Sequence, residues 1–381
     1  MQALSLLIKP VSGCCNMRCD YCFYADVTDQ RAVKHHSVMT EHTLETLVQK
    51  ALSEAQKHCV FGFQGGEPTL AGLDFFEKLI AFEKKHNVNK VSISHTIQTN
   101  GLLLDHAWAD FFRENNFLVG LSIDAGKQIH DSFRLDMSGK GTHTRCLSAA
   151  RLLSKQHVDV NILSVLTRQL ASHPEATYRF YKQHDFRYIQ FIPCIDGLHK
   201  LHGANHYSLD AKTYGRFLCR IFDLWYADVI KQDYRSIRIF DNHIHMLMGY
   251  PPESCAMNGV CSTYALIEAD GSVYPCDFYA VDEFLLGNVH THSFRDMLGS
   301  TAAETFVSPS RQLDPACTSC EYLPLCRGGC RRDREPIIEG ALSRNRFCEA
   351  YQAFFKHSLP RMQAIARENL RMQSVRSRNA K

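Results

Sequence analysis

The chain has 381 residues, of which 45% are hydrophobic and 22% are charged, and its formal net charge is +3. This composition excludes a disordered chain, a collagen-like repeat and a coiled coil, and the charge is too weak to indicate nucleic-acid binding. No apolar run approaches the ~18 residues that span a bilayer. The first ten residues carry neither a charged leader nor a cleavage site, so we expect no signal peptide and no membrane partner.

Six short apolar runs in the first half of the chain predict buried strands of a parallel sheet. Helical patterns lie between them. We expect Thr40 to cap one helix, and Ser172 with Glu175 to form a capping box on another. The alternation predicts an α/β fold, a partial TIM-like barrel of six βα units. The expected strands are Leu4–Ile8, Val60–Gln64, Val91–Gln98, Leu118–Ile123, Val158–Leu166 and Tyr188–Ile192.

The alternation stops after a long helix that we expect over Lys212–Lys231. The remainder is loop-rich and cysteine-rich, and Ala269–Ser272 is expected to turn a hairpin. We therefore predict a barrel domain over residues 1–233 and a smaller α+β domain over residues 234–381. The chain ends in a basic tail, expected to be a solvated helix in which Glu368 is the single acid. Its cations are Arg361, Arg367, Arg371, Arg376, Arg378 and Lys381.

Sixteen cysteines in a chain without a secretory signal indicate metal binding or catalysis rather than disulfides. Cys15, Cys19 and Cys22 follow the first strand with the spacing C-x3-C-x2-C. Three thiolates on one loop can hold three corners of a cubane iron–sulfur cluster and leave the fourth iron open, whereas electron-transfer clusters normally use four cysteines. Two alternatives are a zinc site and a plant-ferredoxin spacing, C-x4-C-x2-C, that uses Cys14 instead of Cys15.

Eight further cysteines lie in the C-terminal region, enough for two fully ligated cubanes. Four of them follow the dense spacing C-x2-C-x5-C-x3-C, for which a pair of zinc sites is the alternative. The eight are Cys255, Cys261, Cys276, Cys317, Cys320, Cys326, Cys330 and Cys348. The remaining five, expected to be packed thiols in apolar surroundings, are Cys14, Cys59, Cys146, Cys194 and Cys219.

The first cysteine motif, with an aromatic residue before its last cysteine, resembles that of the radical S-adenosylmethionine enzymes. Gln64–Pro68, after the second strand, resembles their GGE segment, in which a backbone carbonyl binds the methionyl amine of the cofactor. Glycine allows that close approach. By this resemblance Ser122, Arg134 and Ile195, at or beyond strand ends, would contact the ribose, the carboxylate and the adenine. The full set implied for S-adenosylmethionine is Tyr21, Gly66, Ser122, Arg134 and Ile195.

The C-terminal cysteines resemble the SPASM extension of radical enzymes that modify peptides and proteins. The resemblance implies three 4Fe-4S clusters in all, the first held by Cys15, Cys19 and Cys22. It also implies how the other eight cysteines pair, which spacing alone does not give. One auxiliary cluster would be bound by Cys255, Cys261, Cys276 and Cys330, and the other by Cys317, Cys320, Cys326 and Cys348.

From about Leu4 to Pro360 the chain resembles the anaerobic sulfatase-maturating enzymes. The resemblance implies oxidation of a sulfatase Cys or Ser to Cα-formylglycine, with hydrogen abstraction at Cβ, Asp277 as proton acceptor and an auxiliary cluster as electron acceptor. It implies substrate contacts at Tyr24, Gln64, Gln98 and Asn100. The motifs that carry it are Cys22-Phe23-Tyr24, Gln64–Thr69, Gln98–Gly101, Gly120–Asp124, Asp270–Asp277 and Cys326–Arg331.

The implied partners are a sulfatase polypeptide with a Cys-x-Pro-x-Arg or Ser-x-Pro-x-Arg motif and a flavodoxin- or ferredoxin-like electron donor. Oxygen-sensitive clusters favour a reducing cytoplasm. One alternative is a radical maturase that forms a thioether or another cross-link in a different peptide. The other is a non-catalytic zinc or iron–sulfur scaffold, against which the open corner of the first cluster argues. Asp277 as a surface acid that caps a turn is the plain alternative to its catalytic role.

Overall fold

A computed structural model describes residues 1–338 and 341–379 of the chain. Lys381, the last cation of the expected basic tail, lies outside the described residues, as do the side chains of Arg376 and Arg378. The contacts divide the chain into two compact units. The first unit comprises Met1–Leu163 and Ser262–Phe306, and the second comprises Ser164–Cys261 and Val307–Lys381. The domain boundary expected near residue 234 stays a prediction, because these units group residues by contact and not by family.

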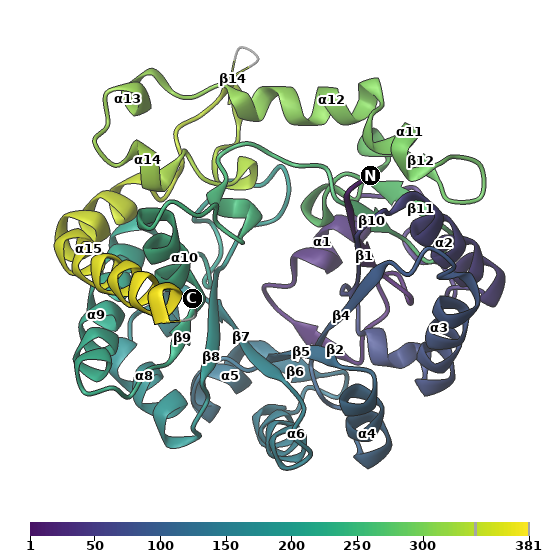
Figure 1. Cartoon of the computed structure of the whole chain (residues 1–381), viewed down its shortest axis with the longest axis horizontal. Coiled ribbons are helices and arrows are strands. Elements are labelled where there is room, and N and C mark those ends of the chain that lie inside the picture. Colours follow the sequence, from purple (N-terminus) through teal and green to yellow (C-terminus); the bar gives the residue numbers. More distant parts are fainter. Residues whose placement is uncertain (339–340, 380–381) are drawn as a thin grey trace. The chain divides into compact units, whose positions relative to one another are not determined.

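All six expected strands are present, which confirms the α/β fold class. In the first unit β1, β3, β4, β5 and the start of β7 lie side by side in parallel (Figure 1). The sixth, β8, pairs in parallel with the short β9 in the second unit. Their bounds are β1 Ala3–Ile8, β3 His58–Phe63, β4 Ser92–Thr99, β5 Phe117–Ser122, β7 Val160–Leu166, β8 Tyr188–Pro193 and β9 Ser236–Ile237.

Helices connect the parallel strands of the first unit and bury one face each. Thr40 caps α2 as expected, since its hydroxyl accepts from the Thr43 N–H, and the leucines of that helix are buried. Phe63, Phe76 and Phe117 form the centre of an aromatic core, with Phe63 and Phe76 ring centroids 4.9 Å apart. The helices are α1 Phe23–Asp29, α2 Glu41–Glu54, α3 Leu73–His86, α4 His106–Glu114, α5 Lys127–Phe133, α6 His143–Lys155, α11 Phe294–Leu298 and α12 Thr301–Val307.

A hairpin from the C-terminal half of the chain extends the sheet of the first unit. β10 (Ala265–Ile267) pairs in parallel with β1, so that Leu6 lies opposite Ala265. β11 (Ser272–Tyr274) then pairs antiparallel with β10, which confirms the turn expected at Ala269–Ser272, and β12 (Gly287–Asn288) pairs with β11. The residues that follow β11 therefore belong to the same unit as the first cysteine motif.

A second small sheet holds the cysteine loop itself. β2 (Met17–Cys19) and β6 (Arg134–Asp136) pair antiparallel, and Cys19 lies opposite Arg134. The loop is thus joined by backbone hydrogen bonds to a segment more than a hundred residues later in the chain.

The second unit consists mainly of helices packed around α9 (Ala211–Ile230), close to the expected bounds. Trp225 and Phe222 of α9 and Phe240 of α10 (Arg238–Leu247) are fully buried, as is Phe354 of α15 (Cys348–Asn379). Burying each such ring contributes about 1.5–3 kcal/mol. The other elements are α7 Arg168–Ala171, α8 Pro174–Gln183, α13 Pro315–Thr318, α14 Leu323–Cys326, β13 Ile337–Ile338 and β14 Ala341–Leu342.

The capping box expected at Ser172 is wrong. α8 begins at Pro174 with His173 as its N-cap and no side-chain cap bond. Ser172 instead ends the preceding short helix, where its hydroxyl donates to the Arg168 carbonyl at 2.8 Å. Two helices follow each other so closely here that the serine serves the first helix and not the second.

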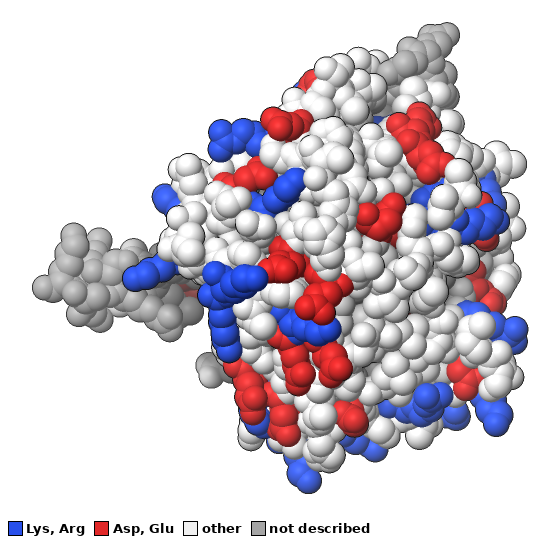
Figure 2. All heavy atoms as spheres, turned by 90° about the vertical axis from the view of Figure 1, so that its right-hand side faces the viewer, with Lys and Arg blue, Asp and Glu red and all other residues white. Residues whose placement is uncertain are grey.

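Acidic and basic side chains are interspersed over the face drawn in Figure 2, in keeping with the small net charge. None of the helices in the described part of the chain combines the length and apolar character that crossing a bilayer requires.

Candidate active site and metal centres

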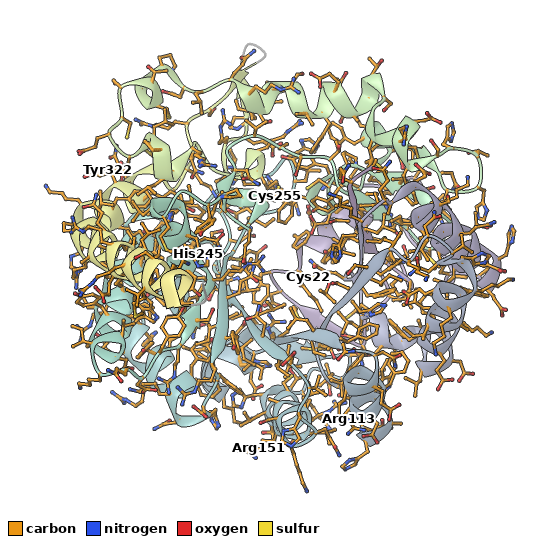
Figure 3. All side chains as sticks on the ribbon, in the orientation of Figure 1. Cys22, Arg113, Arg151, His245, Cys255 and Tyr322 are labelled. Atoms are coloured by element: carbon orange, nitrogen blue, oxygen red, sulfur yellow. The ribbon has the colours of Figure 1, made fainter. Side chains whose placement is uncertain are left out.

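The three cysteines of the first motif lie together on one loop of the first unit. Cys15 Sγ accepts a hydrogen bond from the Met17 N–H at 3.3 Å, and the Cys22 N–H donates to the Cys19 carbonyl at 3.0 Å. Cys22 lies directly before α1 (Figure 3). The loop therefore brings all three thiols to the segment that contains β2 and ends at the start of α1.

The thiols of Cys15 and Cys19 are buried enough to resist ionisation without a metal. Burial raises the pKa of Cys15 to about 12 and that of Cys19 to about 12. Negative charge on Cys22 contributes to the rise in both pKa values, whereas the Arg134 guanidinium opposes the rise at Cys19. A positively charged iron cluster would stabilise the thiolates, so the donor set fits three corners of a cubane.

The GGE segment packs against the cysteine loop. Gly66 has a φ of +61°, and a Cβ atom placed on it would lie 2.3 Å from the Cys14 carbonyl oxygen, so only glycine fits. The Glu67 N–H donates to the same carbonyl at 2.8 Å. The buried Glu67 carboxylate in turn accepts from the Thr99 hydroxyl at 2.7 Å and from the Asn100 N–H at 2.8 Å. The ends of β3 and β4 are thereby tied to the loop.

Among the expected cofactor contacts of the first unit, Tyr21 lies on this loop, and Gly66 and Arg134 lie against it. Ser122 is the last residue of β5, and Arg134 is the first residue of β6. Tyr21 and Arg134 are both buried, with the Arg134 Cζ 5.4 Å from the centroid of the Tyr21 ring. Ile195 belongs to the second unit, two residues beyond the end of β8. Its contact with the cofactor stays a prediction.

Asp277 lies among polar side chains of the first unit. Only 5% of it is exposed. Its Oδ2 accepts from the Tyr24 hydroxyl at 3.0 Å, and its Oδ1 accepts from the Tyr264 hydroxyl. Gln64 Nε2 donates to the Tyr24 hydroxyl at 2.5 Å. Three residues expected near the reacting group, Tyr24, Gln64 and Asp277, thus form one hydrogen-bonded chain.

The other two expected substrate contacts are not part of that chain. The Asn100 amide donates to Asn16 Oδ1 at 2.8 Å and lies 3.8 Å from Cys15 Sγ, so Asn100 lies at the cysteine loop. Gln98 is half-buried in β4, and none of the described residues hydrogen-bonds its side-chain amide. The structure therefore brings Asn100 close to the first cluster site and leaves the Gln98 amide free.

The sequence alone does not indicate several of the residues that lie around Asp277. Tyr264 carries no motif, yet its hydroxyl touches both Asp277 and Cys276 Sγ, the latter at 3.5 Å. Lys9 and Arg31 both lie 2.5 Å from Glu268 Oε1, and all three side chains are fully or almost fully buried. Lys9 Nζ also lies 5.4 Å from the centroid of the Tyr24 ring. The only signal in the sequence is Lys9 at the end of an otherwise apolar strand.

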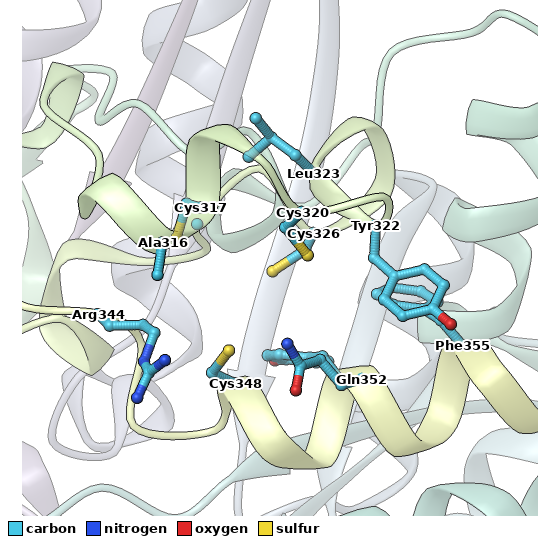
Figure 4. Close-up of a pocket in the computed structure, with 12 residues that line it drawn as sticks. Ala316, Cys317, Cys320, Tyr322, Leu323, Cys326, Arg344, Cys348, Gln352 and Phe355 are labelled. Carbon is cyan, nitrogen blue, oxygen red and sulfur yellow. The ribbon is translucent and has the colours of Figure 1, made fainter.

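The second unit contains a cavity of about 80 Å³ into which four thiols point (Figure 4). Cys317 lies in α13, and Cys320 follows that helix by two residues. Cys326 is the last residue of α14, and Cys348 is the first residue of α15. Burial is the main cause that raises the pKa of Cys326 to about 11, and charge on the neighbouring cysteines contributes to this rise. Four convergent thiols fit a fully ligated cubane. They are the four cysteines that the resemblance assigned to one auxiliary cluster.

Three of the remaining four auxiliary cysteines also lie in the second unit. Charge on Cys255 and Cys261 raises the pKa of Cys330, although burial of Cys330 is the larger cause. Cys276 belongs to the first unit, beside Asp277. The membership of all four in one cluster stays a prediction.

No group of three or more His, Cys, Asp or Glu side chains in the described ranges is arranged to hold a single metal ion. This does not argue against cubanes, because each thiolate of a cubane binds a different iron and the sulfur atoms lie further apart than around one ion. Among the five other cysteines, Cys59, Cys146 and Cys194 are buried as expected and Cys219 is half-buried. Cys14 is exposed, which corrects the expectation that it is packed: its carbonyl, not its thiol, faces the protein interior.

Comparisons with known proteins agree with this arrangement. Residues 10–181 match the radical SAM superfamily, and residues 255–321 match SPASM, an iron–sulfur cluster-binding domain. A cysteine-type anaerobic sulfatase-maturating enzyme of Clostridium novyi is 43% identical over 96% of this chain and 98% of its own. A serine-type enzyme of Bacteroides thetaiotaomicron is 31% identical over 97% of this chain and 93% of its own. The chain belongs to the anaerobic sulfatase-maturating enzymes.

A solved structure supports the same family at the level of the fold. Native anSMEcpe with bound AdoMet and a Cp18Cys peptide superposes with a TM-score of 0.92 at 42% identity, covering 96% of this chain and 99% of that one. As a member of the family, this protein is a radical S-adenosylmethionine enzyme that uses 4Fe-4S clusters and carries out an oxidative maturation, the conversion of a sulfatase residue to Cα-formylglycine.

Proposed function

We propose that this enzyme oxidises the cysteine of a Cys-x-Pro-x-Arg sulfatase motif and that Asp277 is the base. The hydrogen-bonded chain Gln64–Tyr24–Asp277 carries this proposal. The higher identity to cysteine-type relatives, 43% against 31% for a serine-type relative, supports the preference for cysteine. The substrate would be modified in the reducing cytoplasm, with a flavodoxin- or ferredoxin-like protein as electron donor.

The cofactors would be held by the residues already named. The first cluster would be bound by Cys15, Cys19 and Cys22. S-adenosylmethionine would be bound by Tyr21, Gly66, Ser122, Arg134 and Ile195. When bound, these groups would supply radical chemistry at Cβ of the target residue, and the auxiliary clusters would supply an electron acceptor. One auxiliary cluster would use Cys317, Cys320, Cys326 and Cys348, and the other Cys255, Cys261, Cys276 and Cys330.

Asp277 would take the proton of the target thiol. A carboxylate has about four lone-pair positions, and the hydroxyls of Tyr24 and Tyr264 use one on each oxygen. The Cys276 thiol also donates to Oδ1 at 3.5 Å, so the position left on Oδ2 is the one available to the target thiol. The two donors fix the direction of the carboxylate, and Gln64 fixes Tyr24 by donating to its hydroxyl. A base held on both oxygens keeps its geometry when the substrate arrives.

Tyr24 and Gln64 would also bind the substrate, since they lie beside the base. Asn100, beside Cys15, would contact the peptide near the first cluster. Gln98 has an uncommitted amide, which would hydrogen-bond the peptide backbone. The domain division at residue 234 belongs to the same proposal: the barrel residues would perform the radical chemistry and the cysteine-rich residues would take up the electron.

The test is anaerobic incubation of the reconstituted enzyme with reductant, S-adenosylmethionine and two peptides that carry the Cys or the Ser form of the motif. Mass spectrometry reads the aldehyde, and chromatography reads 5′-deoxyadenosine. We expect aldehyde on the Cys peptide. Aldehyde on the Ser peptide alone would overturn the stated preference, and 5′-deoxyadenosine without any peptide change would favour a different peptide substrate.

Asp277→Asn isolates the base. The variant is expected to keep its iron and to form 5′-deoxyadenosine, but to lose about 10²–10⁴-fold in aldehyde formation, the usual contribution of a general base. Asp282→Asn is the matched control, because Asp282 is an exposed acid a few residues later whose carboxylate accepts from the Ala32 N–H. Full aldehyde yield from Asp277→Asn would remove Asp277 as the base.

A further inference from the structure

Arg134 belongs to a closed ring of hydrogen bonds in the first unit. The Asp124 N–H donates to Nδ1 of His130 at 3.2 Å. Burial lowers the pKa of His130 to about 3, so the imidazole is neutral and its proton is on Nε2. That N–H donates to the Thr142 hydroxyl at 3.0 Å, which donates to the Arg134 carbonyl at 2.8 Å. Arg134 closes the ring by donating to the Asp124 carboxylate from Nε at 2.8 Å and from Nη2 at 3.2 Å.

Every member of this ring is buried. Asp124 is 1% exposed, and His130, Thr142 and Arg134 are at most 6% exposed. A buried carboxylate and a buried guanidinium are stable only when they are paired in good geometry, and a two-point pair on one guanidinium edge meets that condition. The pair therefore fixes the plane of the guanidinium as well as its position.

The ring also reaches the cysteine motif. The Tyr21 hydroxyl donates to Asp124 Oδ2, and Tyr21 stands between Cys19 and Cys22 in the sequence. Backbone hydrogen bonds lead to the same place: Cys19 pairs with Arg134 across β2 and β6, and the Asp20 N–H donates to the Phe133 carbonyl at 3.2 Å. Asp124 is thus the common acceptor for a residue of the cysteine loop and for Arg134.

The geometry leaves one nitrogen of Arg134 for a ligand. Nε and Nη2 are both occupied by Asp124, whereas Nη1 has no hydrogen-bond partner among the described residues. A guanidinium held along one edge presents its other nitrogen in a fixed direction, which favours an anionic group such as a carboxylate.

We propose that Asp124 is a positioning residue for the cofactor. It holds Arg134 so that Nη1 meets the carboxylate of S-adenosylmethionine. It also holds Tyr21, which fixes the position of Arg134 relative to the cysteine loop of the first cluster. The inference rests on the cofactor role of Arg134 proposed above. Asp124 acts on the ligand through Arg134 and Tyr21, because its carboxylate accepts from both side chains and is only 1% exposed.

Two ligands separate positioning from general stability. S-adenosylhomocysteine carries the amino-acid carboxylate, and 5′-methylthioadenosine lacks it. In the reconstituted full chain, Asp124→Asn is expected to weaken S-adenosylhomocysteine about tenfold, the loss of one charge-assisted contact, and to change the affinity for 5′-methylthioadenosine less than about twofold. Asp136→Asn is the matched control, because Asp136 lies two residues further along β6 and caps the turn at Ser138.

A double-mutant cycle tests whether Asp124 acts through Arg134. Arg134→Gln is expected to weaken S-adenosylhomocysteine by at least as much as Asp124→Asn, and the double variant no further, because residues that act through one contact are not additive. Additive losses, an unchanged affinity, or equal weakening of both ligands would each overturn the proposal.

A second variant covers the case in which Asp124→Asn does not load iron. Thr142→Val keeps the carboxylate pair but frees the Arg134 carbonyl, and should weaken S-adenosylhomocysteine about two- to threefold without affecting 5′-methylthioadenosine; no difference between the ligands would overturn the proposal. Peptide oxidation is measured separately. A wild-type enzyme that binds S-adenosylhomocysteine but oxidises no sulfatase peptide would defeat the proposed function and leave the role of Asp124 to be decided by binding alone.

Discussion

The first cysteine site and the four-thiol cavity of the second unit are held in different ways. The loop with Cys15, Cys19 and Cys22 is braced by distant parts of its unit: β6 pairs with it, Asn100 reaches Asn16, and Glu67 donates to the Cys14 carbonyl. The backbone around Cys317 and Cys320 is held by local turns, since the Cys317 N–H donates to Asp314 and the Cys320 N–H to Cys317.

This difference separates a preformed site from one that the metal helps to form. A loop tied to several strands keeps its geometry without a cluster, as a site with an open coordination position must if a second ligand is to bind correctly. Thiols on short helices and on a helix start are held in place by the metal when it binds, and metal binding then contributes to folding. Variants at Cys15 and at Cys348 separate the two cases.

Loss of Cys15 is expected to have the largest effect. Cys15→Ala removes one of three ligands, so the first cluster should not assemble and 5′-deoxyadenosine should fall below detection. Iron should drop from about 12 to about 8 per chain. Cys14→Ala is the control, because the exposed Cys14 thiol makes no described contact, and it should keep full cleavage. Unchanged 5′-deoxyadenosine from Cys15→Ala would exclude this cysteine as a ligand.

Loss of Cys348 should have a different signature. Cys348→Ala removes one of four thiols in the second unit, so we expect loss of about 4 irons per chain with 5′-deoxyadenosine formation retained. The melting temperature should fall, because this site is expected to be held by its metal. Cys219→Ala is the control: its half-buried thiol lies on α9 and donates to the Ala353 carbonyl of α15 at 3.8 Å. A full iron complement in Cys348→Ala would contradict the assignment.

The parts of the site that the sequence predicted are local. Three local features predicted the site, each within about ten residues: the cysteine spacing, the GGE segment and the hairpin at Ala269–Ser272. Apolar runs predicted the strands. The stretch of backbone between Cys15 and Cys22 needs no distant partner to be recognised. The chemistry of three thiols on one loop follows from residue type and spacing.

The parts that the sequence did not predict depend on contacts between distant segments. β10 is three residues long, and its partner β1 lies more than 250 residues earlier in the chain. No local pattern therefore indicates the pairing of these two strands. That pairing brings Tyr264 and Asp277 into the unit that holds Tyr24. Tyr264 and Glu268 are single residues of common type, and only the folded chain shows that Tyr264 contacts Asp277 and that Glu268 pairs with Lys9.

The brace at Gly66 is expected to have an intermediate effect. In Gly66→Ala the new Cβ would lie 2.3 Å from the Cys14 carbonyl, and the φ of +61° adds strain of about 1–3 kcal/mol. We expect a lower melting temperature and weaker retention of the first cluster. Gly72→Ala is the matched control, since Gly72 has a φ of +83° but nothing within 4 Å of its Cβ position. Equal behaviour of the two variants would show that strain alone acts and that the contact with the cysteine loop does not matter.

The smallest expected effect concerns the orientation of the base. Tyr24→Phe removes the hydroxyl that donates to Asp277 and accepts from Gln64, at a cost of about 0.5–1.5 kcal/mol per hydrogen bond. Aldehyde formation should fall about three- to tenfold, while 5′-deoxyadenosine and iron stay at the wild-type level, because the cysteine loop keeps its own brace. Tyr264→Phe removes the donor on the other oxygen of Asp277 and gives the symmetrical comparison. If both variants lower 5′-deoxyadenosine as much as aldehyde, the residues around Asp277 and the first cluster site form one coupled structure. The geometry of the cysteine loop would then depend on these tyrosines and would not be preformed independently of them.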